Sequence, residues 1–129
     1  MKQFIGLIVV LVGVVCLVFG VIFIFQAADA RQEVADSIAP LTLSELDAKY
    51  ETVEASHNQL RAVEEPKIQA GQAAPSATYN YLSAQRALLG IARTNVGLAN
   101  FAQNMGIIEI VMGVAFLFTG WAVARKSTA

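Results

Sequence analysis

The stretch "GLIVVLVGVVCLVFG" at residues 6–20 and the stretch "GIIEIVMGVAFLFTG" at residues 106–120 both place glycine at their first, eighth and fifteenth positions. Seven residues make nearly two turns of an α-helix, so glycines at this spacing form one stripe that drifts by only about 20° per repeat. The shared spacing therefore predicts two helices that pack through a face of small residues. The predicted packing residues are Gly6, Gly13, Gly20, Gly106, Gly113 and Gly120.

The composition around these stretches is typical of a membrane protein. The chain of 129 residues is 56% hydrophobic and 15% charged, which is too apolar for an ordinary water-soluble domain. Residues 4–25 carry no charge, and a helix of that length crosses a hydrocarbon core of about 30 Å. We therefore predict an all-α membrane protein with two transmembrane helices, at residues 1–25 and 105–124.

Basic residues flank both predicted spans on one side. Lys2 precedes the first span, and Arg125 and Lys126 follow the second. Because basic residues mark the cytoplasmic side of a membrane, we expect both termini, including the tail at residues 125–129, to be cytoplasmic. Residues 26–104 would then be external, and the membrane would be the plasma (inner) membrane. Small residues before Arg31 resemble a signal cleavage site, but the apolar run is longer than a signal peptide's, which favours an uncleaved helix.

The predicted external segment is helical, and its prolines mark the breaks. Pro40 favours an end of the first helix just before it. The sequence "TLSE" at residues 42–45 has the pattern of a capping box, which predicts a new helix. The predicted elements are an extension of the first helix to about residue 38, a helix at about residues 43–64, a loop at residues 65–76 and a helix from residue 77 into the second span.

The second and third predicted helices are expected to pair as an extended extramembrane hairpin. Apolar residues recur at alternating spacings of three and four along the helix at residues 43–64. In an antiparallel pair, Val53 would face Leu89 and His57 would face Gln85. A histidine at such a position serves as a ligand or a pH switch in some proteins. We favour a packed and hydrogen-bonded residue, because an amide is expected opposite.

The third predicted helix has a second apolar face. Leu88, Ile91 and Leu98 lie roughly opposite the face expected to meet the second helix. A helix that is apolar on two opposed faces is usually buried on both. We therefore predict that these three residues face a partner, either another copy of the chain or another protein.

Residue types that carry catalysis or bind metals are scarce. Cys16 is the only cysteine and His57 the only histidine, so neither a disulfide framework nor a Cys/His metal cluster can form within one chain. The sequence also has no Gly-rich phosphate loop, no serine nucleophile motif and no basic stripe for nucleic acid. We expect a protein that is not an enzyme, uses no cofactor or metal and binds no nucleic acid.

Three classes of function remain open at this point, and an enzyme is the least expected of them. The favoured one is a structural or accessory membrane protein that contacts lipid and assembles with itself or with a larger membrane complex. The alternative is a homo-oligomeric channel or ion-conducting subunit that uses Glu109, the one ionisable group in either span. Because Glu109 is predicted to lie beside the glycine face, we favour a structural carboxylate that is hydrogen-bonded to Gln26 or Gln103. A signal-transducing receptor is a further alternative, whose output would need a partner.

Overall fold

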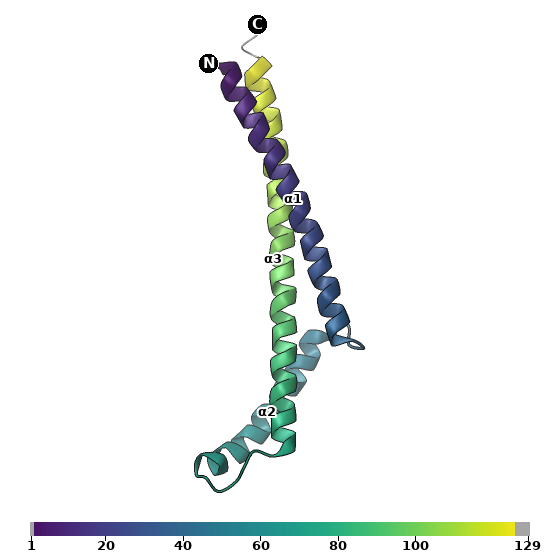
Figure 1. Cartoon of the computed structure of the whole chain (residues 1–129), viewed down its shortest axis with the longest axis vertical. Coiled ribbons are helices and arrows are strands. Elements are labelled where there is room, and N and C mark those ends of the chain that lie inside the picture. Colours follow the sequence, from purple (N-terminus) through teal and green to yellow (C-terminus); the bar gives the residue numbers. More distant parts are fainter. Residues whose placement is uncertain (1, 126–129) are drawn as a thin grey trace. The chain divides into compact units, whose positions relative to one another are not determined.

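The computed structural model describes residues 2–125, which form three α-helices and no strand. The helices are α1 (Lys2–Ile38), α2 (Leu46–Gln69) and α3 (Ala77–Arg125) (Figure 1). Both α1 and α3 are long and apolar enough to cross a membrane. The predicted all-helical fold with two long apolar helices is therefore confirmed. Of the predicted tail at residues 125–129, all but Arg125 lies outside the described residues.

The contacts divide the chain into two units, each with its own packing. The first unit combines α1 up to Arg31 with α3 from Leu98 onward, and we call it the span unit because it holds the predicted spans. The middle unit is Gln32–Gly97, which holds the end of α1, all of α2 and the start of α3.

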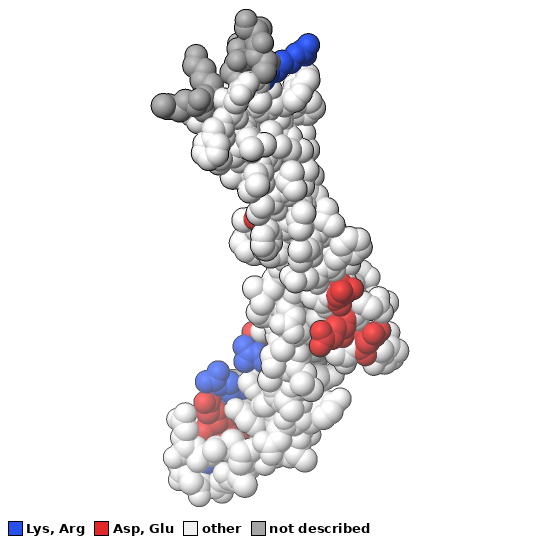
Figure 2. Space-filling view, turned by 45° about the horizontal axis from the view of Figure 1, so that its top comes forward, with Lys and Arg blue, Asp and Glu red and all other residues white. Residues whose placement is uncertain are grey.

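In the span unit, most large apolar side chains point away from the other helix. Only 11% of the residues in the most apolar window of each helix are buried. The face drawn in Figure 2 is almost free of charged side chains along these spans. Large side chains that are more than half exposed include Phe4, Leu7, Leu11, Phe25, Phe101, Val111 and Phe118.

The middle unit has a small core to which all three helices contribute. The buried residues are Val34 from α1, Leu46 and Val53 from α2, and Leu89 and Ala92 from α3. Val53 and Leu89, the pair predicted to face each other, thus both lie in this core. A spacing of three and four keeps such residues on one side of each helix.

The helix predicted from about residue 43 begins at Leu46, because residues 42–45 form a turn. The backbone amide of Glu45 donates to the Thr42 carbonyl at 3.1 Å, which closes the turn. The carboxylate of Glu45 accepts from both the amide and the hydroxyl of Thr42, and these hydrogen bonds lower the pKa of Glu45. This is the reaching-back half of a capping box, and α2 begins at Leu46, directly after it.

The helix predicted to end at about residue 64, before a loop at residues 65–76, continues to Gln69. Pro66 lies inside α2, which ends at Gln69. After α2, Gly71 adopts a φ of 67°. Its amide donates to the Ile68 carbonyl at 3.0 Å, and that of Gln72 donates to the Lys67 carbonyl at 2.9 Å. These two bonds form a Schellman motif, so Gly71 rather than Pro66 ends the helix.

The start of α3 is tied to the last turns of α2. The Ser76 hydroxyl accepts the amide of Tyr79 at 3.0 Å, as an N-cap residue does. The Glu64 carboxylate in turn accepts from the hydroxyl of Ser76 at 2.6 Å and from its amide at 3.0 Å. These hydrogen bonds lower the pKa of Glu64. A carboxylate on α2 thus positions the cap of α3.

Candidate helix-packing site

In the span unit, the six glycines lie opposite one another in three pairs. The pairs are Gly6 with Gly120, Gly13 with Gly113, and Gly20 with Gly106. A Cβ atom added to Gly13 would lie 2.8 Å from the carbonyl oxygen of Gly113, and one added to Gly113 would lie 2.8 Å from that of Gly13. Each glycine therefore meets the backbone of the opposite helix, and this contact lies within one chain.

The other two pairs approach just as closely. Cβ atoms added to Gly20 and Gly106 would each lie 2.7 Å from the partner's carbonyl oxygen. For Gly6 and Gly120 the corresponding distances are 2.9 and 2.8 Å. Since Cβ atoms in real structures essentially never come within 3.0 Å of another atom, all six positions require glycine at this helix separation.

The residue four positions after each glycine covers the glycine opposite. On α1 these residues are Val10, Leu17 and Ile24, whose side chains lie within 3.0 Å of the Cβ positions of Gly120, Gly113 and Gly106. On α3 they are Ile110, Leu117 and Ala124, which cover Gly20, Gly13 and Gly6. Each helix thus places an apolar side chain into the space beside a glycine of the opposite helix, where that glycine has no side chain. These covering residues were not predicted from the sequence, although they repeat at the same interval of seven.

The stripe of small residues continues beyond the glycines. Ala27, seven residues after Gly20, and Ala99, seven residues before Gly106, are 1% and 3% exposed. The next positions at this interval, Val34 and Ala92, lie in the core of the middle unit. The alanines on α3 were missed in the sequence, where the spacing alone could have identified them.

A polar cluster lies near this part of the span unit. The Arg31 guanidinium donates to the Asn100 side-chain oxygen at 2.5 Å and also to that of Gln103. Glu109 is partly exposed. Within residues 2–125, its side chain forms neither of the predicted hydrogen bonds, to Gln26 or to Gln103. The side-chain oxygen of Gln103 accepts from Arg31 instead.

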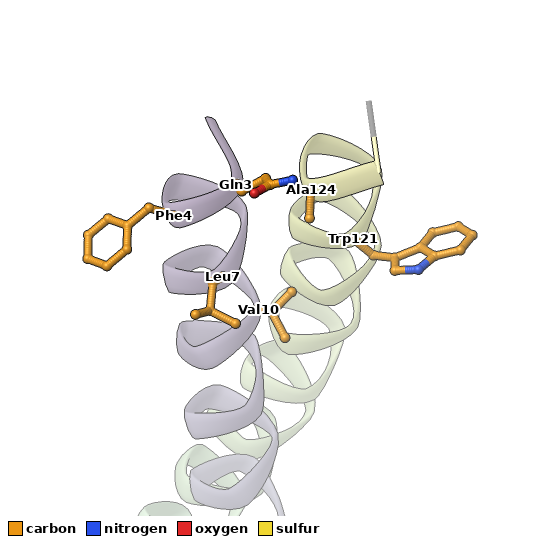
Figure 3. A pocket seen from close by; sticks show the side chains of 6 residues that line it. All are labelled: Gln3, Phe4, Leu7, Val10, Trp121 and Ala124. Carbon is orange, nitrogen blue, oxygen red and sulfur yellow. The ribbon is translucent and has the colours of Figure 1, made fainter. Parts of the chain in front are cut away.

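Two apolar grooves run along the sides of the span unit. The first has a volume of about 560 Å³ and is lined by Gln3, Phe4, Leu7, Val10, Trp121 and Ala124. Figure 3 shows Phe4 and Trp121 pointing away from the helix pair in opposite directions, while Val10 lies between the helices. The second, of about 650 Å³, is lined by Val10, Val114, Leu117, Phe118 and Trp121. Such linings suit hydrocarbon chains rather than a polar ligand.

In the middle unit, His57 is buried and bonded to α3. Its Nε2 lies 3.0 Å from the Ser83 hydroxyl, which donates to the Tyr79 carbonyl at 2.8 Å. A Ser83 hydroxyl that donates its proton to Tyr79 accepts from His57, and this assignment places the imidazole hydrogen on Nε2. The prediction of Gln85 as the partner is therefore wrong. Nδ1 is buried and has no hydrogen-bond partner within the described chain.

Ion pairs flank this histidine along the α2–α3 contact. Arg86 donates to Glu54 at 2.7 Å, and Arg93 pairs with Asp47 at 2.8 Å. Hydrogen bonds with Tyr50 and Glu54 raise the pKa of Arg86. The α2 residues His57, Glu54 and Asp47 contact Ser83, Arg86 and Arg93 of α3, in that order. The residue numbers fall along α2 while they rise along α3, so the two segments run antiparallel.

A small cavity lies beside these pairs. It has a volume of about 330 Å³ and is lined by Tyr50, His57, Ser83, Arg86, Ala87 and Gly90. Arg86, the positively charged residue in the cavity lining, forms an ion pair with Glu54. Within residues 2–125, no three His, Cys, Asp or Glu side chains form a group that could hold a metal ion.

The residues predicted to face a partner lie on the surface of α3. Leu88, Ile91 and Leu98 are 69%, 60% and 62% exposed. No contact within the chain covers them to the degree found for Leu89, which is 8% exposed. The sites described thus consist of packing surfaces and paired charges. No protein-family model, curated protein or solved structure matches the chain.

Proposed function

We propose that the chain is an integral membrane protein with a structural or accessory role, which assembles with itself or within a larger membrane complex. The observation that carries the proposal is the pairing of six glycines between two helices whose other faces expose large apolar side chains. In water, such side chains would be buried, whereas in lipid they are already solvated. Close packing of small residues is then what holds the helices together.

The proposed topology follows from charge and from helix direction. Basic residues beside both ends of the chain favour cytoplasmic termini, with residues 26–104 on the other side of a plasma (inner) membrane. The antiparallel contacts of α2 with the start of α3 support an external helical hairpin. Its ion pairs on a mostly polar surface suit an aqueous compartment.

We propose a non-enzymatic role because the polar side chains of the candidate site form ion pairs and hydrogen bonds with groups of the same chain. Arg86 and Arg93 are held by carboxylates, and the Ser83 hydroxyl is held by a backbone carbonyl. A nucleophilic serine gives its proton to a base that a third group orients. The Ser83 hydroxyl instead donates to the Tyr79 carbonyl, and Nδ1 of His57 has no partner in the described chain that would orient the ring. By contrast, exposed leucines and isoleucine on α3 offer a surface for assembly.

A channel would place different demands on the same helices. The glycine pairs bring the backbones of α1 and α3 together, so a pore would have to form between copies and not within one. Glu109 is the residue that would line it, as an ionisable group in a span.

The proposal is tested by extraction of the membrane with carbonate, followed by purification in mild detergent and measurement of mass. We expect the protein to stay in the carbonate-resistant fraction and to purify as a homo-oligomer or with co-purifying membrane proteins. Release by carbonate would contradict the membrane assignment. A monomer without associated protein would contradict the accessory role.

A further inference from the structure

The exposed face of α3 in the middle unit has the spacing of a second helix-packing seam. Its members recur at alternating intervals of three and four, and all are exposed. We call this set the outer stripe: Tyr81, Ala84, Leu88, Ile91 and Asn95. In heptad terms, Tyr81, Leu88 and Asn95 occupy a positions, and Ala84 and Ile91 occupy d positions.

The outer stripe and its flanks carry no charge. In the first 32 residues of α3, from residue 77 to 108, the charged residues are Arg86 and Arg93. Both are turned toward α2, where they pair with Glu54 and Asp47. The positions beside the stripe are Asn80, Gln85, Ala87, Ala92 and Thr94. Two identical helices could therefore approach through this face without repulsion between like charges.

Asn95 is the polar member of this apolar stripe. A single asparagine at an a position specifies the register and oligomer number of a coiled coil, at some cost in stability. It does so by pairing with its counterpart, because an amide offers both donors and an acceptor to an identical amide. An unrelated partner would have to supply a matching polar group, whereas a second copy supplies it automatically.

We propose that the outer stripe docks onto the same stripe of a second copy, with the two α3 helices parallel and in register. This inference rests on the proposed membrane topology, since copies that cross one bilayer in the same direction hold each residue at the same depth. Parallel alignment then places Asn95 against Asn95 and Leu88 against Leu88. The partner-facing residues of α3 thus form a self-recognising surface.

The test is disulfide formation between copies in the membrane. Asn95→Cys, in a Cys16→Ser background, should form a covalent dimer on mild oxidation, because facing a positions lie within disulfide reach. The matched control is Gly97→Cys, half a turn around the same helix, where an added Cβ meets no atom within 4 Å. We expect at least about a tenfold greater dimer yield at position 95 than at position 97, given the geometric limits on disulfides.

A second variant tests the apolar contact. Ile91→Glu should dissociate the dimer in mild detergent, and because Ile91 is 60% exposed, the fold of the single chain should survive. Asn95→Val should still associate but give a mixture of oligomer sizes.

The outcomes separate this inference from the proposed function. If wild-type protein purifies in a complex but position 95 yields no more dimer than position 97, the self-docking is wrong and the accessory role stands. If Ile91→Glu leaves the homo-oligomer intact, the outer stripe is not its interface. If wild-type protein is a lone monomer in both membrane and detergent, both proposals fail.

Discussion

At Gly113, the space for a side chain is set by the backbone of the opposite helix. A Cβ there would lie 2.8 Å from the Gly13 carbonyl oxygen and 2.8 Å from Cγ of Leu17. The carbonyl belongs to a regular helix and cannot turn aside, so α1 itself would have to move. Val10 illustrates the same closeness from the other side. Its Cγ2 atom lies 2.8 Å from the Cβ position of Gly120.

We expect Gly113→Leu and Gly13→Leu to separate α1 from α3 in the span unit and to lower the stability of the helix pair. Overpacking of a filled interface costs about 1–3 kcal/mol or more. Thermal unfolding in detergent, followed by circular dichroism, measures the loss. The matched control is Val111→Leu, at a side chain that is 63% exposed. Equal stability of the glycine variants and the control would show that the close approach is not needed.

His57 shows how a buried polar residue is accommodated at this scale. One ring nitrogen is bonded to Ser83, and the ring packs against Tyr79 with centroids 5.4 Å apart. The other nitrogen is buried with no partner in the described chain. The sequence correctly indicated a packed position, because the spacing of three and four places residue 57 on the core side. Its partner depended on the register of two helices, which a repeat in one helix does not define.

At the scale of helices, the end of α2 depends on the backbone of one residue. Gly71 has a φ of 67° and no heavy atom within 4 Å of its Cβ position. Gly97 is also open to an added Cβ, but it lies inside α3 and its φ is not positive. The two glycines therefore differ in conformation and not in available space.

We expect Gly71→Ala to destabilise the protein and Gly97→Ala to stabilise it. Alanine at a left-handed C′ position costs about 1 kcal/mol, and alanine within a helix gains about 0.5–1 kcal/mol over glycine. Thermal unfolding in detergent measures the stability changes of both variants under the same conditions. A Gly71→Ala protein as stable as wild type would contradict the role of the Schellman motif.

The link between α2 and α3 should depend on pH through Glu64. Hydrogen bonds from Ser76 lower the pKa of Glu64 below its usual value of 4.5. A lowered pKa in the folded state contributes stability above the unfolded pKa, and this contribution is lost as the pH falls through the folded pKa. We therefore expect Glu64→Gln to reduce stability at pH 7, and the difference from wild type to shrink as the pH is lowered below about 4.5.

The measurement is thermal unfolding of both proteins between pH 7 and pH 3. Glu51→Gln is a suitable control, because Glu51 is an exposed carboxylate on the same helix, α2. If the effect of Glu64→Gln did not change with pH, the link between Glu64 and Ser76 would not be electrostatic.

At the scale of the whole molecule, Glu109 distinguishes a scaffold from a conductor of ions. In a structural protein, Glu109→Gln keeps a polar side chain and should leave the assembled mass unchanged, whereas Glu109→Leu should weaken assembly if a polar partner is lost. In a conductor, the glutamine variant should assemble normally and lose ion flux. We expect no flux from reconstituted wild-type protein under an ion gradient or membrane tension, as the accessory role requires. Flux that Glu109→Gln abolishes would establish the channel instead.

The sequence by itself determined the helices and their apolar faces. Helix type and the small-residue stripe follow from local spacing, because residues three, four and seven positions apart lie on one side of a helix whatever surrounds it. The positions of the two apolar helices, and the glycine repeats in them, could thus be predicted from residues 6–20 and 106–120 alone.

Only the tertiary structure decided which atoms meet. The glycine pairs within one chain, the contact of Val10 with Gly120 and the choice of Ser83 for His57 each depend on the register between helices distant in sequence. The physical reason is that spacing defines the face of a helix, whereas register depends on the fit of two complete surfaces.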